Sequence, residues 1–223
     1  MLAVGGRKPA VAAGVWESAS FLLDAESLKE HATLAGHGDL VRSVAFDRQG
    51  KWLATGSLDK TIHLRDPKTG KTQATLAGHH LPVMGVAFVP DGKFLFSCSG
   101  GMDSTGKHEI GGLKLWDLST KSERLTMKAH QATCLDIVCS TNNKRAFSCS
   151  ADQTWKVWDV STGQELFSLS GHTGPIRCLA CTLNGELIAT GGDDGAVRLW
   201  NGTVPLAIRE LHEVTQPATP PEK

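Results

Sequence analysis

Apolar and polar positions alternate along the chain in short runs, and turn residues separate the runs. After the first histidine-containing turn, four such runs follow one another: VRSVAF, WLATGS, TIHLRD and TQATLAG. Alternation with a period of two is typical of half-buried strands. The glycine, aspartate and asparagine residues between runs tolerate the positive φ of tight hairpins. The pattern therefore predicts four strands, at residues 41–46, 52–57, 61–66 and 72–78.

This order of runs recurs, and a histidine marks each return. Gly36-His37, Gly78-His79 and Gly171-His172 share a dipeptide, and Ala129-His130 is its variant. The period is about 42 residues, close to that of propeller blades with GH and WD signatures. The unit after His79 is about nine residues longer, and the register places this insertion within residues 100–112.

A hydroxyl residue, an aspartate and a tryptophan follow these histidines at fixed distances. The units resemble WD40 repeats, and FSCSADQTWKVWD at residues 147–159 is the clearest match. The resemblance implies that the four side chains form a hydrogen-bonded structural relay in each blade. A buried indole, hydroxyl, imidazole and carboxylate each need a partner. The relay positions are His37, Thr55, Asp59, His79, Ser97, Trp116, His130, Ser148, Asp152, Trp158, His172, Thr190, Asp194 and Trp200.

Two units depart from this pattern. Arg65 stands in place of tryptophan, so we expect the relay that begins at His37 to lose its indole end. In the next unit the insertion removes a secure register for the aspartate, and Asp103 is only a candidate. We therefore expect these two blades to be looser than the unit at residues 130–158.

The fold class predicted is all-β, a WD40-type β-propeller of four-stranded antiparallel blades, with four complete blades and a partial N-terminal one. The partial unit has runs that match the second, third and fourth strands but lacks a first strand. LAIRELH at residues 206–212 fits a final fourth strand, and the prolines after it argue against a central strand there. The expected units are residues 1–36 (partial blade), 37–78, 79–129, 130–171 and 172–212 (blades), and 213–223 (proline-rich tail).

Ring closure is the main structural question that the repeat count raises. The count is near the low end of the 4 to 8 blades of known propellers. An open ring would expose apolar blade faces. Three outcomes fit: the chain is a piece of a longer protein, another copy or a partner completes the ring, or five blades close imperfectly. The first is favoured, because Met1 falls inside a repeat.

Composition and charge argue against several classes of protein. Lys and Arg number 23, and Asp and Glu number 23, so the net charge is zero. Nonspecific binders of nucleic acid or membrane normally carry a basic excess. The start MLAVGGRKPA has no apolar core of a secretory signal, and no run approaches the roughly 18 apolar residues of a membrane span. We expect a soluble protein that binds neither membrane nor nucleic acid.

The cysteines invite a metal or disulfide interpretation, most of all Cys178 and Cys181. Residues three apart on a strand point to opposite faces, so this pair cannot readily hold one ion. Cys139 and Cys181 share a core-facing strand position, and Cys98 and Cys149 lie beside the relay hydroxyl. We predict buried free thiols with no metal site, which suits a reducing compartment such as the cytoplasm.

Two short motifs resemble catalytic signatures. PKTGKT at residues 67–72 is similar to the end of a phosphate loop, but Arg65 stands where its first glycine is required. His108-Glu109 has no second histidine at the spacing of a zinc protease. We interpret the first as a hairpin turn and the second as part of a solvated loop.

Two functions of different class follow. We predict a noncatalytic protein-interaction scaffold or regulatory module that needs no cofactor and binds peptides or loops on the propeller face. The alternative is a propeller-type hydrolase or lyase at the channel mouth, which needs convergent acid, base or metal groups. The only loose acids are Asp39, Asp136 and Asp193, and they share no common repeat position.

The resemblance also implies where partners dock. In WD40 proteins, partners usually contact the face around the central channel, through residues three and five positions after the histidine and just before the aspartate. These positions hold mostly apolar residues and two arginines, a combination that would suit a ligand with apolar and acidic side chains. The alternative, that these side chains only pack in a bulge, stays open. The positions are Leu40, Arg42, Leu58, Pro82, Met84, Thr133, Leu135, Ala151, Pro175, Arg177 and Asp193.

The insertion, SGGMDSTGKHEIGG at residues 99–112, is the one feature that the repeat does not dictate. Its glycines and polar residues predict a mobile hairpin or loop. Such loops often carry binding, but long surface insertions are also tolerated without a role. Retention of a partner after deletion of Asp103 to Gly111 would separate these two interpretations.

Overall fold

The computed structural model describes residues 2–9, 16–23, 30–102, 104–202 and 210–213. In this part of the chain every helix or strand assigned is a β-strand, and the strands form five antiparallel sheets. We number the sheets blade 1 to blade 5 in chain order. Blade 1 has three strands: β1 (Leu2–Pro9), β2 (Trp16–Leu23) and β3 (Glu30–Thr33).

Each of the other blades has four strands, which pair in chain order from the inner strand to the outer one. Blade 2 comprises β4 (Val41–Phe46), β5 (Leu53–Ser57), β6 (Thr61–Arg65) and β7 (Thr72–Ala77). Blade 3 comprises β8 (Val83–Phe88), β9 (Phe94–Ser99), β10 (Gly112–Asp117) and β11 (Ser122–Lys128). Blade 4 comprises β12 (Cys134–Cys139), β13 (Arg145–Ser150), β14 (Thr154–Asp159) and β15 (Glu165–Ser170). Blade 5 comprises β16 (Ile176–Cys181), β17 (Leu187–Gly192), β18 (Val197–Asn201) and β19 (Glu210–Glu213).

The repeat extends to details of the backbone. The inner strand of each four-stranded blade has a bulge at the same point, which re-aims the residues just before it toward one end of the strands. The turn after the inner strand also repeats, with a residue at positive φ each time: Gly50 at 68°, Gly92 at 72°, Asn143 at 61° and Gly185 at 70°. The bulges lie at Val41/Ser43, Val83/Gly85, Cys134/Asp136 and Ile176/Cys178.

The hydrophobic core is divided among the junctions between successive blades. A single sheet of this size cannot bury its own faces, so each one is stabilised by its neighbours. One cluster of buried side chains fills each of the four junctions. Representative members are Leu22 with Leu53, Ile62 with Val86, Phe96 with Ile137, and Trp155 with Leu179.

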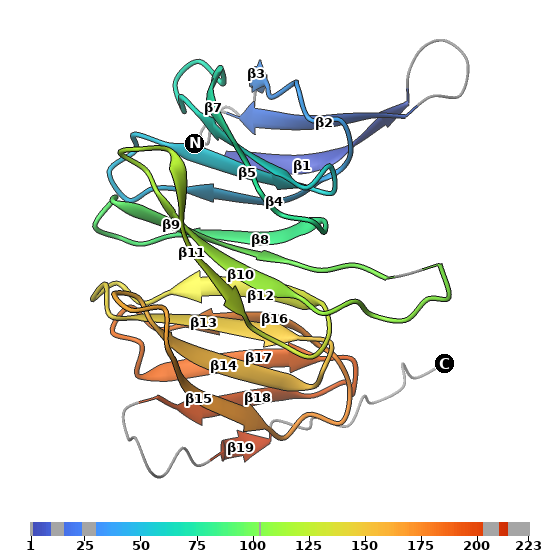
Figure 1. Ribbon diagram of the computed structural model, residues 1–223, viewed down its shortest axis with the longest axis vertical. Helices are drawn as coiled ribbons and strands as arrows, with labels where there is room; N and C mark the ends of the chain where they lie inside the picture. Colours follow the sequence, from blue (N-terminus) through green and yellow to red (C-terminus); the bar gives the residue numbers. More distant parts are fainter. Residues whose placement is uncertain (1, 10–15, 24–29, 103, 203–209, 214–223) are drawn as a thin grey trace, which may run out of the picture.

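The ring is open. Figure 1 shows blade 1 at one end of the long axis and blade 5 at the other, with the other blades stacked between them. Trp155 on blade 4 is fully buried against blade 5, whereas its repeat equivalent on blade 5, Val197, is 52% exposed. Leu187 on the same sheet is 42% exposed. The fold is therefore an incomplete propeller, with four complete blades and a partial first one, as the repeat count predicted.

Candidate functional site

Blade 4 has a complete set of relay contacts. His130 Nδ1 lies 3.1 Å from Asp152 Oδ2, and His130 Nε2 lies 2.8 Å from Ser148 Oγ. Trp158 Nε1 donates to the same hydroxyl over 2.9 Å. Burial raises the pKa of Asp152, but hydrogen bonds from His130 and Thr154 outweigh it and hold the pKa well below its usual range. Blade 5 repeats these contacts with His172, Thr190, Asp194 and Trp200.

Among the described residues, blade 3 has the relay without its carboxylate. His79 Nε2 lies 2.6 Å from Ser97 Oγ, and Trp116 Nε1 donates to that oxygen over 2.8 Å. Counted back from the tryptophan, the aspartate position falls on Ile110, which is 64% exposed. The candidate Asp103 lies outside the described residues. Burial, together with the nearby Lys114 charge, lowers the pKa of His79 to about 4.

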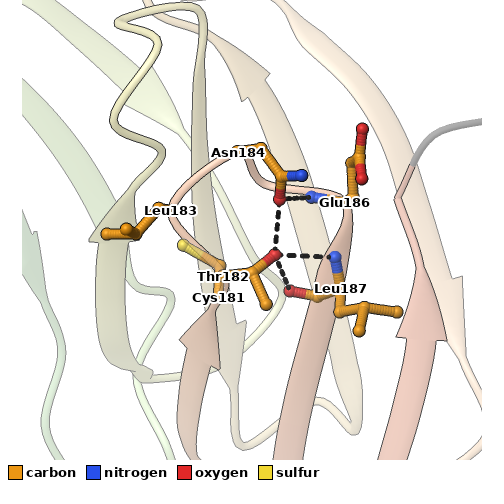
Figure 2. A pocket seen from close by; sticks show the side chains of 6 residues that line it. All are labelled: Cys181, Thr182, Leu183, Asn184, Glu186 and Leu187. Atoms are coloured by element: carbon orange, nitrogen blue, oxygen red, sulfur yellow. Dashed lines mark hydrogen bonds between the residues drawn. The ribbon is translucent and has the colours of Figure 1, made fainter.

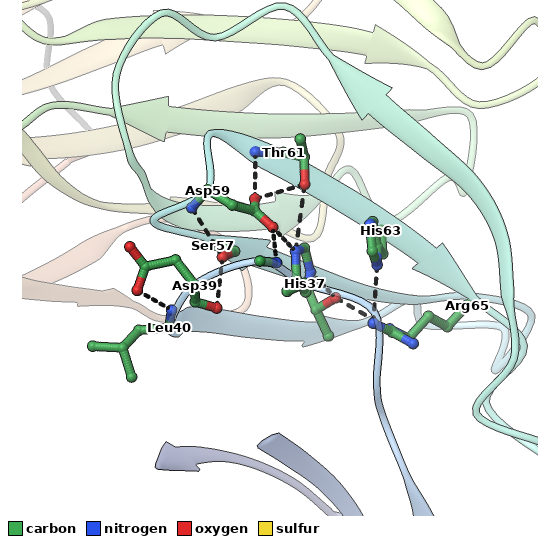
Figure 3. Close-up of polar contacts among 10 residues, drawn as sticks. His37, Asp39, Leu40, Ser57, Asp59, Thr61, His63 and Arg65 are labelled. Atoms are coloured by element: carbon green, nitrogen blue, oxygen red, sulfur yellow. Dashed lines mark hydrogen bonds and ion pairs between the residues drawn. The ribbon is translucent and has the colours of Figure 1, made fainter. Parts of the chain in front are cut away.

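In blade 2 an arginine takes the place of the indole (Figure 3). His37 bridges Asp59 and Thr55 over 2.8 and 2.9 Å, and Arg65 Nε donates to the Thr55 hydroxyl over 3.3 Å. The guanidinium is almost fully buried, with Arg65 1% exposed. The relay of blade 2 therefore has no indole end, but the arginine supplies another N–H to the Thr55 hydroxyl at the same point.

Arg65 also binds a second histidine. Its Nη2 lies 3.0 Å from Nδ1 of His63, and its Nη1 donates to the Gly70 carbonyl over 3.3 Å. The His63 ring stacks on His37, with the centroids 3.8 Å apart and the planes 13° apart. Burial, together with the neighbouring His37 and Arg65, lowers the pKa of His63 to about 4. His63 is thus neutral at pH 7, and its Nδ1 accepts a hydrogen bond from the Arg65 guanidinium.

A cavity of about 290 Å³ opens where the inner strands and the turns after the second strands meet. Among the described residues, Arg177 is the one charged residue of the lining, and Asp193 already holds that guanidinium through contacts of 2.8 Å and 2.5 Å. The remaining lining is mostly apolar, so the cavity suits an uncharged group. Its lining residues come from blades 2 to 5: Leu58, Pro82, Met84, Gly100, Gly101, Met102, His108, Thr133, Leu135 and Arg177.

A comparison with known families decides what these repeats are. The family model described as WD domain, G-beta repeat matches residues 28–66, 70–107, 121–159 and 163–201, which is more than half of the chain. The chain belongs to the WD40 family. No curated protein matches it at a significant level. WD40 repeats generally mediate protein–protein interaction, and here their relays hold the blades that surround the cavity.

The WD40 positions assigned to partner binding divide into two groups. Six of them line the cavity: Leu58, Pro82, Met84, Thr133, Leu135 and Arg177. The others, Leu40, Arg42, Ala151, Pro175 and Asp193, are not among its lining residues. Arg42 instead borders a separate shallow depression of about 160 Å³ with Val41, Ser43 and Val44.

A backbone hydrogen bond that recurs in blades 2 to 5 joins two of the repeat positions in each blade that were predicted to bind partners. The N–H of the residue before the relay aspartate donates to the carbonyl of the residue three after the histidine. This bond joins Leu58 to Leu40, Ala151 to Thr133 and Asp193 to Pro175, over 2.9, 3.0 and 2.8 Å. In blade 3 it joins Gly100 to Pro82 over 3.0 Å.

Four cavity residues were missed because they lie in the insertion: Gly100, Gly101, Met102 and His108. The place of Gly100 at the cavity could have been predicted from its repeat position. Counted forward from His79, it occupies the position before the relay aspartate, and its backbone bond to Pro82 is that of the other blades. Nothing in the repeat register indicates how the insertion folds back to place His108.

The alternative enzyme hypothesis rests on three aspartates as candidate catalytic acids. All three carboxylates accept hydrogen bonds within the chain, and none lines the cavity. Asp39 accepts the N–H of Leu40, and Asp193 binds Arg177. Asp136 accepts the N–H of Ile137 and that of Leu179 on the next blade, and burial raises its pKa. Across the described ranges, no three His, Cys, Asp or Glu side chains lie close enough together to hold a metal ion. No helix in the same ranges could cross a membrane.

The cysteines are all free, but not all are buried. Cys98, Cys134 and Cys149 are buried, and burial raises the pKa of the Cys134 and Cys149 thiols. Cys139 and Cys181 are half-buried. The prediction is wrong for Cys178, which is exposed. Cys178 lies on β16, the inner strand of blade 5, the last blade in the open stack.

Proposed function

We propose that this WD40 domain is a noncatalytic interaction module that binds a peptide or loop of a partner protein in the cavity on the channel face. The observation that carries the proposal is the cavity itself, in which six residues predicted from the WD40 resemblance gather around one apolar space. Buried apolar anchors in a central pocket dominate the affinity of most protein interfaces. The WD40 membership supports the same general role.

We further propose that additional blades, from a longer parent chain or from a partner, pack against blade 5. A depression of about 610 Å³ lies on blade 5, and Figure 2 shows the residues that line it, where the Thr182 hydroxyl donates to Asn184 Oδ1. Leu183, which borders it, is 78% exposed. The matching turn of blade 4 contacts the next blade, because Thr141 N donates to the Leu183 carbonyl over 2.9 Å. The free thiols are consistent with the cytoplasm as the compartment of this assembly.

The docking proposal is tested with peptides selected from a phage-displayed library of random sequences on the intact chain. We expect Met84→Glu to weaken binding of a selected, fluorescently labelled peptide by about tenfold or more, because a carboxylate would be placed in the apolar cavity. Fluorescence anisotropy measures the dissociation constant.

Leu166→Glu is the matched control. Leu166 is 41% exposed on β15, does not line the cavity, and receives the same charge. The proposal is wrong if Met84→Glu and Leu166→Glu bind the peptide as tightly as the wild type does while both remain folded by circular dichroism.

A further inference from the structure

The insertion between β9 and β10 forms a hairpin whose base is fixed to the neighbouring blade. Met102 and His108 pair across its two arms, and Glu109 N donates to the Gly101 carbonyl over 2.9 Å. Thr133 of blade 4 joins both arms, because its hydroxyl donates to the Gly101 carbonyl over 2.6 Å and lies 2.9 Å from His108 Nδ1. These hydrogen bonds hold the base of the segment against blade 4.

Two glycines let the arms approach blade 4 this closely. A Cβ atom on Gly100 would lie 2.5 Å from Cγ2 of Thr133, and one on Gly111 would lie 2.4 Å from the backbone nitrogen of Cys134. The Gly111 N–H donates to the Ala132 carbonyl over 2.9 Å. Any larger residue at these positions would displace the hairpin, so the glycines set its position against the blade.

The hairpin positioned in this way forms one wall of the docking cavity. Met102 and His108 line it from the hairpin, while Met84 and Leu135 line it from the inner strands of blades 3 and 4. Met102 is 58% exposed, so a ligand in the cavity can reach its side chain. A volume of about 290 Å³ lies at the lower limit for small-molecule sites, and it fits a side chain better than a whole ligand.

We propose that the hairpin is the specificity element of this site, and that the cavity takes one bulky, uncharged apolar side chain from an extended peptide segment. This inference rests on the proposed docking function. The two methionines can adjust to the shape of a leucine, methionine or phenylalanine side chain, because the thioether chain is flexible and polarizable. A charged anchor is disfavoured, since Asp193 already pairs with Arg177 and no other lining residue among those described is charged.

The insertion itself provides a matched pair of variants for the test. Met102 and Ile110 are both exposed apolar residues of this segment, at 58% and 64%, but only Met102 lines the cavity. With a phage-selected peptide as probe, we expect Met102→Lys to raise the dissociation constant about tenfold and Ile110→Lys to leave it within about twofold. We also expect replacement of the peptide's apolar anchor by aspartate to abolish measurable binding.

The possible results distinguish failure of the hairpin proposal from failure of the docking function on which it rests. If Met84→Glu weakens binding but Met102→Lys and Ile110→Lys have equal effects, the hairpin is not a specificity element and the docking function stands. If neither Met84→Glu nor Met102→Lys changes the dissociation constant, both proposals fail. A peptide whose acidic residue proves essential, with an apolar anchor that alanine replaces without loss, also overturns the assignment of an apolar ligand.

Discussion

Replacing Trp158 with alanine is expected to lower the free energy of unfolding by about 3 to 5 kcal/mol. The indole is 2% exposed and lies in the cluster that joins blades 3 and 4, beside Ala146 and Val160. Its Nε1 also donates to Ser148 over 2.9 Å, so the substitution removes both packing and the terminal donor of the relay. Urea unfolding followed by circular dichroism measures the change.

Trp158→Phe separates the two contributions. Phenylalanine keeps most of the buried ring but provides no donor to Ser148, and we expect a smaller loss of about 1 to 3 kcal/mol. A loss below about 1 kcal/mol for the alanine variant would contradict the account of the relay as a structural device in a buried junction.

Acidification from pH 7 to pH 4 is expected to destabilise the fold strongly, before most carboxylates titrate. The pKa values of His63 and His79 are lowered from 6.5 to about 4 in the folded chain, chiefly by burial. The unfolded chain takes up these protons near pH 6.5, but the folded chain does so only near pH 4. Stability that is fully present above pH 6.5 is therefore lost as the pH falls toward 4, by up to about 3 kcal/mol for each histidine.

Urea midpoints measured across this pH range test the expectation. A double variant, His63→Gln with His79→Gln, is expected to show a much weaker dependence between pH 6.5 and 4, whatever its stability at pH 7. Asp59 adds a second pH range, below that of the histidines, in which the stability of the fold decreases on acidification. Burial raises its pKa, but hydrogen bonds from Thr61, Gly38 and His37 lower it to about 2. Its contribution is lost as the pH falls from about 4 through 2. Equal wild-type midpoints at pH 7 and pH 4.5 would contradict the assignment of neutral buried histidines.

The repeat register was sufficient to predict the blades, because spacing alone determines which residues share a strand position. It could not predict how Arg65 is accommodated. The arginine is buried because its three donor groups find Thr55, Gly70 and His63, and His63 lies in a sequence position with no relay role. The contact between His63 and His37 depends on the close stacking of two rings, which no spacing rule expresses.

The cavity could be predicted only in part, for a related reason. Leu58, Met84 and Leu135 occupy repeat positions, and the register assigns them to one face. Met102 and His108 reach the same cavity because Gly100 and Gly111 lie against blade 4, a contact that involves residues of two repeats. An insertion has no counterpart in the other units, so its path depends on tertiary contacts alone.

Photo-crosslinking through methionine tests the central claim, docking in the channel-face cavity, most directly. The chain has four methionines; Met84 and Met102 line the cavity, and Met127 is buried on β11. With a diazirine analogue of methionine incorporated throughout, a bound phage-selected peptide is expected to crosslink to Met84 and Met102 and not to Met127. Mass spectrometry locates the crosslinks. A peptide that binds the chain but crosslinks to neither Met84 nor Met102 would contradict the account.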